Sequence, residues 1–188
     1  MSKLITVHGS GGHGRVVTNT ALLLGYQVIA TDDKWHKRPG TNQPCHMAVG
    51  DNAVRKQFLN HSMVTLIHPA ACVDASVRIG DGCFVGPLAV VNVAAKVGQG
   101  CILNTGCIIE HDCEIGDWCH VSPGAVLCGT VRLGEGCWVG ANAVIRQGIT
   151  IAPWVTIGAG AVVVKDVTDS GVYVGNPSHP INRGSRGD

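Results

Sequence analysis

Residues 79–102 read IGDGCF VGPLAV VNVAAK VGQGCI, which is four copies of one six-residue pattern. The pattern runs without a break in register from residue 67 to residue 168, and its first position is Val, Ile or Leu in all seventeen copies. The fifth position is Cys or Ala in twelve of them, and Gly is frequent at the second. Such a short fixed period is typical of a solenoid, and a hexapeptide period predicts a parallel β-helix.

The packing needs of a solenoid explain the pattern. Each hexad forms a short strand whose branched first residue points inward, while the small fifth residue lies near a corner where little volume remains. Three hexads close one triangular coil, so residues eighteen apart stack at the strand spacing of about 4.8 Å. Seventeen hexads make between five and six coils. A sandwich of hairpins would need turn clusters at irregular spacing, and the repeat does not contain them.

Composition excludes several classes of function. The chain has 188 residues and a net charge of +1, without the basic runs typical of proteins that bind nucleic acid or a membrane surface. The sequence shows neither a signal-peptide pattern nor an apolar segment of membrane-spanning length, so we expect a cytoplasmic protein.

Six of the nine cysteines occupy the fifth position of a hexad. Four of these six are spaced eighteen residues apart and are expected to form one ladder along an inner edge: Cys83, Cys101, Cys119 and Cys137. We expect free thiols that act as small apolar side chains in a reducing compartment. A ladder of metal ligands is the alternative interpretation.

The chain divides into a small α/β unit at 1–66, the β-helix at 67–170 and a tail at 171–188. Hydrophobic patterning predicts a Rossmann-like β-α-β-α-β unit in the first part. Its strands are expected at 4–8, 26–30 and 63–67, and its helices at 15–24 and 51–59, the second opened by an Asp51 cap. The polar segment 35–47 is expected to be a loop.

A glycine-rich turn separates the first strand from the first helix. Gly9, Gly11 and Gly14 match the G-x-G-x-x-G dinucleotide fingerprint, and Asp32 follows at about the expected distance. The unit is too short to hold a whole dinucleotide, so we keep only the physical content of the motif, a helix N-terminus that receives an anion. The turn, with its histidine and the acidic pair that ends the second strand, suits a nucleotide or nucleotide sugar. The alternative is a tight turn that binds nothing.

Polar side chains are rare within the middle coils, and they gather in one place. His111 lies at the outward third position of its hexad, with Glu110 beside it, and His120 ends the next hexad. Gly129 lies one coil after His111, and Asn92 lies one coil before Glu110. A base, a carboxylate that orients it and a backbone N–H donor are the groups that acyl transfer needs. The alternative is a solvated histidine on the wall of a solenoid.

Several segments resemble a known family. They are NTGCIIEHDCEIGDWCHVSPGAVLCG at 104–129, the Val-Asn pair at 91–92, GSGGHGR at 9–15 and GNPS at 175–178. Together they resemble the hexapeptide acetyltransferases that modify amino sugars in bacterial surface-glycan synthesis. Within this group they are most similar to the nucleotide-linked 4-amino-sugar N-acetyltransferases and the sialic-acid O-acetyltransferase relatives. The GNPS segment has Ser178 where the family usually has Ala, and Arg15 stands where a Lys is common.

The resemblance implies a left-handed β-helix, acetyl-CoA as cosubstrate, a nucleotide-linked (UDP, dTDP or GDP) amino sugar as acceptor, and no metal. It implies that His111 is the general base and that Glu110 orients it. The residues that it implies for acetyl-CoA are His120, Gly129, Gly175 and Pro177. Those that it implies for the nucleotide sugar are Gly11, Gly12, His13, Arg15, Asp32, Asp33 and Asn104.

We also expect a homotrimer with shared sites. His111 and His120 are nine residues apart, which is half a coil, so within one subunit they do not face the same small pocket. A head-to-tail contact between two prisms would bring the two walls together and close as a three-fold ring.

Rival functions are a zinc enzyme of the carbonic-anhydrase type, which needs three converging imidazoles, and a nucleotide-sugar sensor without catalysis. A sugar O-acetyltransferase is a third. Only His111, His120 and His68 face outward in the predicted coils.

Overall fold

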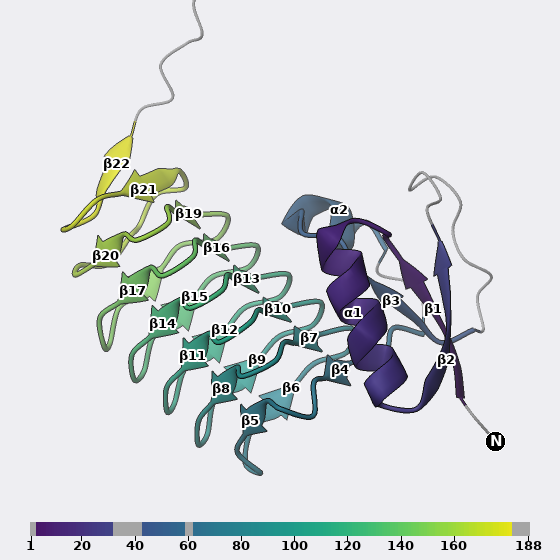
Figure 1. Cartoon of the computed structure of the whole chain (residues 1–188). Helices are drawn as coiled ribbons and strands as arrows, with labels where there is room; N and C mark the ends of the chain where they lie inside the picture. The colour runs from purple at the N-terminus through teal and green to yellow at the C-terminus, as the bar shows by residue number, and fades with distance from the viewer. Residues whose placement is uncertain (1–2, 32–42, 59–61, 182–188) are drawn as a thin grey trace, which may run out of the picture.

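The computed structural model describes residues 3–31, 43–58 and 62–181. A small α/β unit packs against one end of a long parallel β-solenoid, and the chain leaves through a hairpin at the other end (Figure 1). Within the described ranges, no helix is long and apolar enough to span a membrane.

Three parallel sheets form the three walls of the solenoid. Wall 1 contains β4 (Leu66–Ile67), β7 (Phe84–Val85), β10 (Ile102–Leu103), β13 (His120–Val121), β16 (Trp138–Val139) and β19 (Thr156–Ile157), followed by the hairpin strands β21 (Val172–Val174) and β22 (His179–Ile181). Wall 2 contains β5 (Cys72–Val73), β8 (Val90–Val91), β11 (Ile108–Ile109), β14 (Val126–Leu127), β17 (Val144–Ile145) and β20 (Val162–Val163). Wall 3 contains β6 (Arg78–Ile79), β9 (Lys96–Val97), β12 (Glu114–Ile115), β15 (Arg132–Leu133) and β18 (Thr150–Ile151).

The register of the walls confirms the predicted period. Ile102 pairs with His120, and Ile108 pairs with Val126, so each strand lies beside the strand eighteen residues further on. The core of the solenoid consists of first-position and fifth-position side chains, almost all of which are fully buried from residue 83 onward. The hexapeptide pattern therefore positions every wall and every corner of this part of the fold.

The inner ladder of cysteines also forms as predicted. All nine cysteines are free. The buried thiols of the ladder donate hydrogen bonds to backbone carbonyls, for example Cys101 Sγ to the oxygen of Gly116 at 3.2 Å and Cys119 Sγ to the oxygen of Gly134 at 3.1 Å. These thiols satisfy corner carbonyls inside the solenoid, which is a packing role.

The N-terminal unit differs from the prediction in its third strand. Its parallel sheet has the order β2 (Tyr26–Thr31), β1 (Lys3–His8), β3 (Cys45–Met47). Along the chain, helix α1 (Gly12–Leu23) connects β1 to β2. The strand predicted at 63–67 is divided between the two parts of the fold: Met63 makes an isolated parallel bridge to Cys45 of β3, whereas Leu66–Ile67 is β4 of wall 1. The strand β3 was missed because it is only three residues long and follows a polar segment, although all three residues are buried.

The unit covers the outside of wall 1. Ile5, Val7, Val17, Ala21 and Ala48 form one buried cluster with the outward side chains of the first three strands of that wall, which are Leu66, Phe84 and Ile102. These three successive outward positions are all apolar, and burying them against the unit stabilises its packing at this end of the solenoid.

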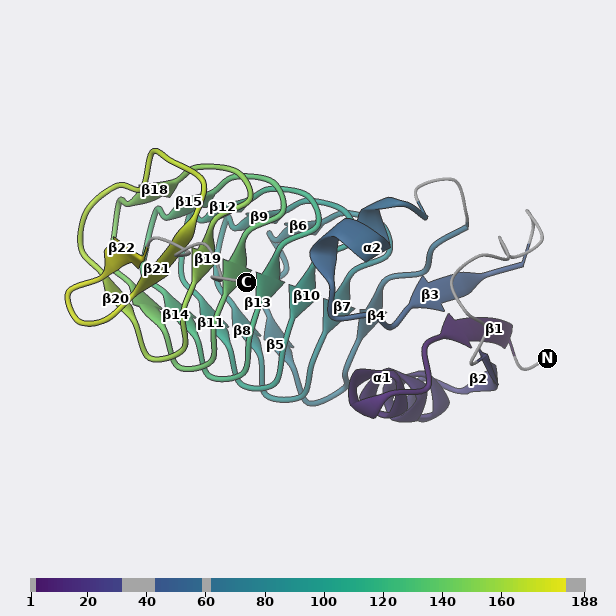
Figure 2. The same cartoon turned by 90° about the horizontal axis from the view of Figure 1, so that it is seen from above.

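The second helix, α2 (Asn52–Lys56), lies alongside the solenoid (Figure 2) and begins at the predicted cap, where the Asp51 carboxylate accepts a hydrogen bond from the N–H of Val54. The buried Arg55 guanidinium donates to the carbonyls of Gly100 (3.0 Å) and Trp118 (3.1 Å). The amide of Asn52 donates to the carbonyl of Gly136 at 3.1 Å.

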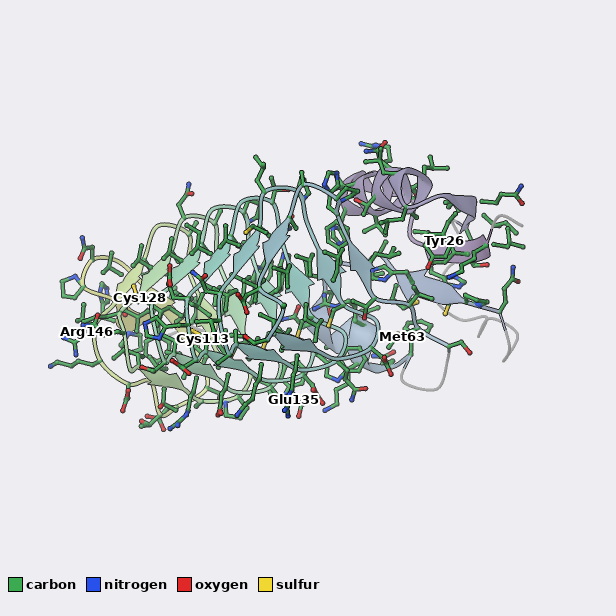
Figure 3. The ribbon with its side chains drawn as sticks, turned by 90° about the horizontal axis from the view of Figure 1, so that it is seen from below. Tyr26, Met63, Cys113, Cys128, Glu135 and Arg146 are labelled. Carbon is green, nitrogen blue, oxygen red and sulfur yellow. The ribbon has the colours of Figure 1, made fainter. Side chains whose placement is uncertain are left out.

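These three carbonyls stack along one corner with the period of the coils, and α2 therefore fixes the unit against the corner between walls 3 and 1. Lys56 adds an ion pair with Glu135, and the side chain of Glu135 lies on the outside of the solenoid (Figure 3).

Candidate functional site

His111 lies in the turn that joins wall 2 to wall 3, and its side chain is 54% exposed. Its Nδ1 is 2.8 Å from Oδ2 of Asp112. A carboxylate only accepts hydrogen bonds, so Nδ1 carries the proton and Nε2 keeps a free lone pair. This is the tautomer that a general base needs.

Asp112, not Glu110, is the carboxylate bonded to His111. The Glu110 carboxylate instead accepts a hydrogen bond from Nδ2 of Asn92 at 3.0 Å, one coil earlier. Asp112 adopts a left-handed conformation with φ 59°, which Asp tolerates better than most residues. The sequence signal for this pairing is a short carboxylate directly after the histidine, and the expected orienting carboxylate, Glu110, is not the one bonded to Nδ1.

Gly129 lies against the imidazole, as the spacing of eighteen predicted. A Cβ at this position would lie 2.5 Å from Nε2 and 2.6 Å from Cε1 of His111. Gly129 does not have a positive φ, so contact with the ring, and not backbone conformation, explains the glycine. Among the described residues, its backbone N–H makes no hydrogen bond, and it remains available as a donor.

His120 points outward from wall 1, as expected, but it is buried there, with an exposed fraction of 8%. The Oδ1 of Asn104 accepts from the N–H of Thr105 at 2.8 Å, which leaves Nδ2 as the atom 3.1 Å from Nε2 of His120. Since Nδ2 only donates, Nε2 of His120 is an acceptor and Nδ1 carries the proton. Burial and the charge of Arg55 lower the pKa of His120 to about 3, so the ring is neutral.

The glycine-rich turn leads into α1 with an open N-terminus. A Cβ on Gly14 would clash with the carbonyl oxygen of Gly9, which explains that glycine by close packing. Gly11 and Gly12 meet nothing within 4 Å, and no side chain caps the helix at Gly11. The turn is therefore open at Gly11 and Gly12, and the N–H groups at a helix N-terminus lack intrahelical partners and can donate to an anion.

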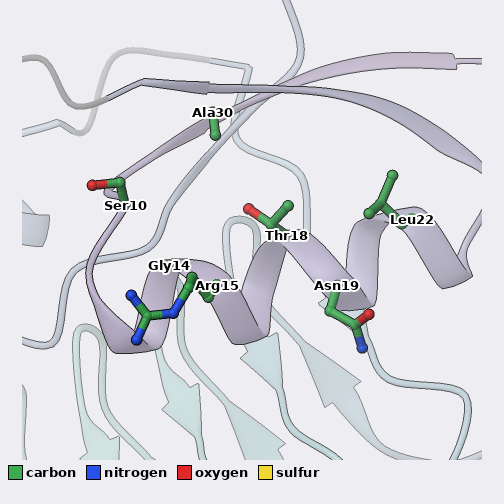
Figure 4. Close-up of a pocket in the computed structure, with 7 residues that line it drawn as sticks. All are labelled: Ser10, Gly14, Arg15, Thr18, Asn19, Leu22 and Ala30. Carbon is green, nitrogen blue, oxygen red and sulfur yellow. The ribbon is translucent and has the colours of Figure 1, made fainter.

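Two further residues flank this turn. Arg15 lines a depression of about 310 Å³ with Ser10, Thr18 and Ala30, between α1 and β2 (Figure 4). His13 packs edge-on against Phe84 of wall 1, with ring centroids 5.3 Å apart, and burial lowers its pKa to about 4. Asp32 and Asp33 lie outside the described residues.

These predicted site residues lie in three parts of the fold. His13, Asn104 and His120 lie along the seam between the N-terminal unit and wall 1. His111 and Gly129 lie at the corner between walls 2 and 3, which is the corner opposite wall 1. Gly175 and Pro177 are exposed in the terminal hairpin turn, where the carbonyl of Gly175 accepts from the N–H of Val162.

A metal centre has no support in the described part of the chain, where no three His, Cys, Asp or Glu side chains are grouped to hold an ion. The rival zinc enzyme needs three imidazoles around one metal.

Comparison with known proteins identifies the family of the chain. The family described as bacterial transferase hexapeptide (six repeats) matches residues 94–129 and 130–165, and the hexapeptide repeat of succinyl-transferase matches 76–111. The acetyltransferase domain of PglB from Neisseria gonorrhoeae FA1090, solved with acetyl coenzyme A, is 35% identical with a TM-score of 0.88, over 96% of this chain and 100% of that one. The chain belongs to the hexapeptide-repeat sugar acetyltransferases.

Two more structures place this sugar acetyltransferase among its relatives. PerB from Caulobacter crescentus, solved with CoA and GDP-perosamine, is 31% identical with a TM-score of 0.86, over 95% of this chain and 97% of that one. WeeI from Acinetobacter baumannii AYE has a TM-score of 0.84 at 24% identity, over 96% and 100% of the two chains, and shows likeness of fold alone. The match covers both the N-terminal unit and the solenoid.

Proposed function

We propose that the protein is an N-acetyltransferase that moves the acetyl group of acetyl-CoA to the amino group of a nucleotide-linked 4-amino sugar. The observation that carries the proposal is the His111–Asp112 pair beside Gly129, with the Nδ1 proton held by the carboxylate and the Nε2 lone pair free. The ligands of the PglB domain and of PerB support the two substrate classes.

The chemistry follows from the positions of these groups. The sugar nitrogen attacks the thioester carbonyl carbon while Nε2 of His111 accepts an amine proton, a step that such a base accelerates by roughly 10²- to 10⁴-fold. The Gly129 N–H donates to the oxyanion that forms on the carbonyl oxygen. The C–S bond then breaks, and the CoA thiolate takes up the proton from His111. Asp112 stabilises the imidazolium in between.

The nucleotide sugar binds at the glycine-rich turn. The uncapped N-terminus of α1 supplies free N–H groups for the diphosphate, and Arg15 lies beside them. Gly11 and Gly12 leave the backbone accessible to phosphate oxygens. His13 stays neutral because burial lowers its pKa to about 4. Its ring packs against Phe84 and closes the inner end of this site.

A complete site then needs two subunits. Within one subunit the glycine-rich turn lies over wall 1 and His111 lies at the opposite corner, so a sugar bound at the turn is out of reach of its own subunit's base. We propose a cyclic trimer in which each turn faces the His111 corner of a neighbour, which is the head-to-tail contact that closes with three-fold symmetry.

Thiol release from acetyl-CoA, measured with a panel of nucleotide-linked 4-amino sugars and their 4-hydroxy counterparts, tests the activity. We expect release with at least one amino sugar, little with the hydroxy sugars, and loss of turnover in His111→Ala. A wild-type protein that releases no CoA with any amino sugar would refute the proposal, and preferential use of a hydroxy sugar would favour O-acetylation.

Subunit complementation tests the shared site. His111→Ala removes the base, and Gly12→Glu places a carboxylate where the phosphates bind without a clash inside the protein, because a Cβ at Gly12 has no neighbour within 4 Å. Random reassembly of the two inactive variants in equal amounts makes about one site in four fully intact, so about a quarter of wild-type activity should return. Mixtures that stay inactive would place the whole site within one subunit.

A further inference from the structure

The exposure of the outward side chains of wall 1 increases from coil to coil between Phe84 and Trp138. Phe84 and Ile102 are buried under the N-terminal unit, and His120 is 8% exposed. The next residue in this row, Trp138, is 46% exposed. The seam between the unit and the solenoid therefore opens at Trp138, and the largest apolar side chain of the row lies at its mouth.

Trp138 is held rigidly in spite of this exposure. Its Nε1–H donates to Oγ of Ser122 at 2.9 Å. Its ring stacks on the imidazole of His120, with centroids 5.8 Å apart and an angle of 3° between the planes. His120 is itself fixed by Asn104, so a chain of contacts fixes the exposed indole in one orientation.

The second exposed tryptophan of the solenoid has an evident structural partner. Trp154 is 40% exposed, but it packs over Gly136 at the corner and the Lys56 ammonium lies 5.3 Å from its ring centroid. In the described part of the chain, no side chain covers the open part of Trp138 in this way. An aromatic surface that is both fixed and uncovered is suited to bind a ligand ring.

The position of Trp138 indicates which ring. The phosphate-binding turn lies at the level of Phe84, which His13 contacts. Trp138 lies three coils further along wall 1, and coils stack at about 4.8 Å, so it is about 14 Å from that level. A diphosphate followed by one pyranose ring covers a span of this order, whereas the nucleoside extends from the other end of the diphosphate.

We propose that Trp138 is the floor of the acceptor-sugar subsite, where the apolar C–H face of the amino sugar packs against the indole. This inference rests on the proposed function and deepens it. The C–H face of a pyranose, and the methyl group of a 6-deoxy sugar above all, buries apolar area on an aromatic ring. Packing on this face leaves the 4-amino group at the rim of the ring, free to meet the neighbouring subunit's base.

The role of His120 follows from the same contacts. With Nε2 bonded to Asn104 and its ring stacked on Trp138, His120 positions these two side chains. Asn104, which is partly exposed, supplies a polar edge beside the indole for a sugar hydroxyl.

Steady-state kinetics on Trp138→Ala and Trp138→Phe test the proposal, with Trp154→Ala as the matched control. We expect Trp138→Ala to raise the KM for the amino sugar about tenfold and to leave the KM for acetyl-CoA within about twofold. Trp138→Phe keeps an aromatic surface and should recover most of the lost affinity. Trp154→Ala should leave both KM values unchanged.

Tryptophan fluorescence gives a readout that does not depend on turnover. Binding of the nucleotide amino sugar alone should change the emission of wild type and Trp154→Phe but not of Trp138→Phe. A rise in the KM for acetyl-CoA, or a fluorescence change with acetyl-CoA alone, would make Trp138 a coenzyme contact and overturn the proposal. Dissociation of the oligomer by Trp138→Ala would overturn it in favour of a subunit contact.

Different results would refute the proposed function and the proposed sugar subsite. If wild-type protein neither binds nor acetylates any amino sugar, the proposed function is wrong, and the proposed sugar subsite is then wrong as well. If wild type is active and Trp138→Ala has the same KM for the amino sugar and the same KM for acetyl-CoA as wild type, only the proposed sugar subsite is wrong.

Discussion

Gly129→Ala should inactivate the protein through the imidazole it touches. The added Cβ would lie 2.5 Å from Nε2 of His111, while ordinary van der Waals contact begins at 3.4 Å. The ring must therefore move by roughly 0.9 Å, because the backbone of the solenoid corner cannot give way as easily as an exposed side chain. A displacement of about 1 Å in a catalytic group can cost about 10²-fold in rate, and we expect kcat to fall by about that factor.

The same geometry predicts that the fold survives. Gly129 does not have a positive φ, so alanine introduces no backbone strain. The side chain of His111 is 54% exposed, and its ring can turn into solvent without opening the core. The midpoint of thermal unfolding should therefore stay within about 2 °C of wild type.

Thiol-release kinetics on a double-mutant cycle provide the assay. If Gly129→Ala acts by displacing the ring, then His111→Ala alone and His111→Ala combined with Gly129→Ala should have the same kcat. Losses that multiply in the double variant would show that the added methyl acts elsewhere. Near-wild-type kcat in Gly129→Ala would refute the close contact between the ring and residue 129.

Three further results are expected. Asp112→Asn should lower kcat at least about tenfold, because the Nδ1 proton loses its carboxylate, whereas Glu110→Gln should stay within about threefold; equal losses in the two variants would contradict the assignment. Burial lowers the pKa of three histidines, to about 4 for His13 and His46 and about 3 for His120. The unfolded chain takes up these protons near pH 6.5 and the native protein does not. The free energy of unfolding should thus be level above about pH 6.5 and fall toward pH 4 by up to roughly 1.4 kcal/mol per pH unit for each histidine; urea unfolding that is flat between about pH 7 and 5 would count against this. Finally, all nine cysteines should titrate as free thiols in denaturant without reductant, and a shortfall that reductant restores would reveal a disulfide.

The N-terminal unit shows where local sequence signals failed. Strand β3 (Cys45–Met47) is too short for a periodic pattern, and its position depends on pairing with β1, so only the folded chain reveals it. The predicted strand at 63–67 pairs with two different sheets: Met63 bridges to Cys45 of this unit, and Leu66 pairs with Phe84 of β7 in the solenoid. Hydrophobicity identified a strand in that segment and could not identify its partner.

In the candidate site, too, the sequence predicted some contacts and missed others. Periodicity alone placed Gly129 against His111 and Asn92 against Glu110, because residues eighteen apart must stack in a coil of three hexads. The pairing of His111 with Asp112 depends on a left-handed residue in the turn, and a repeat pattern carries no information about such a conformation.

The sequence by itself determined the solenoid, because a six-residue alternation of inward and outward side chains has one way to bury its branched residues. It also determined which residues share a corner. Only the tertiary structure decided that the N-terminal unit covers wall 1, that His120 lies buried beneath Trp138, and that the glycine-rich turn and His111 are on opposite sides of one subunit. Those facts depend on long-range packing, through the apolar cluster around Phe84 and the hydrogen bonds of Arg55 to stacked corner carbonyls, and no local pattern in the chain encodes them.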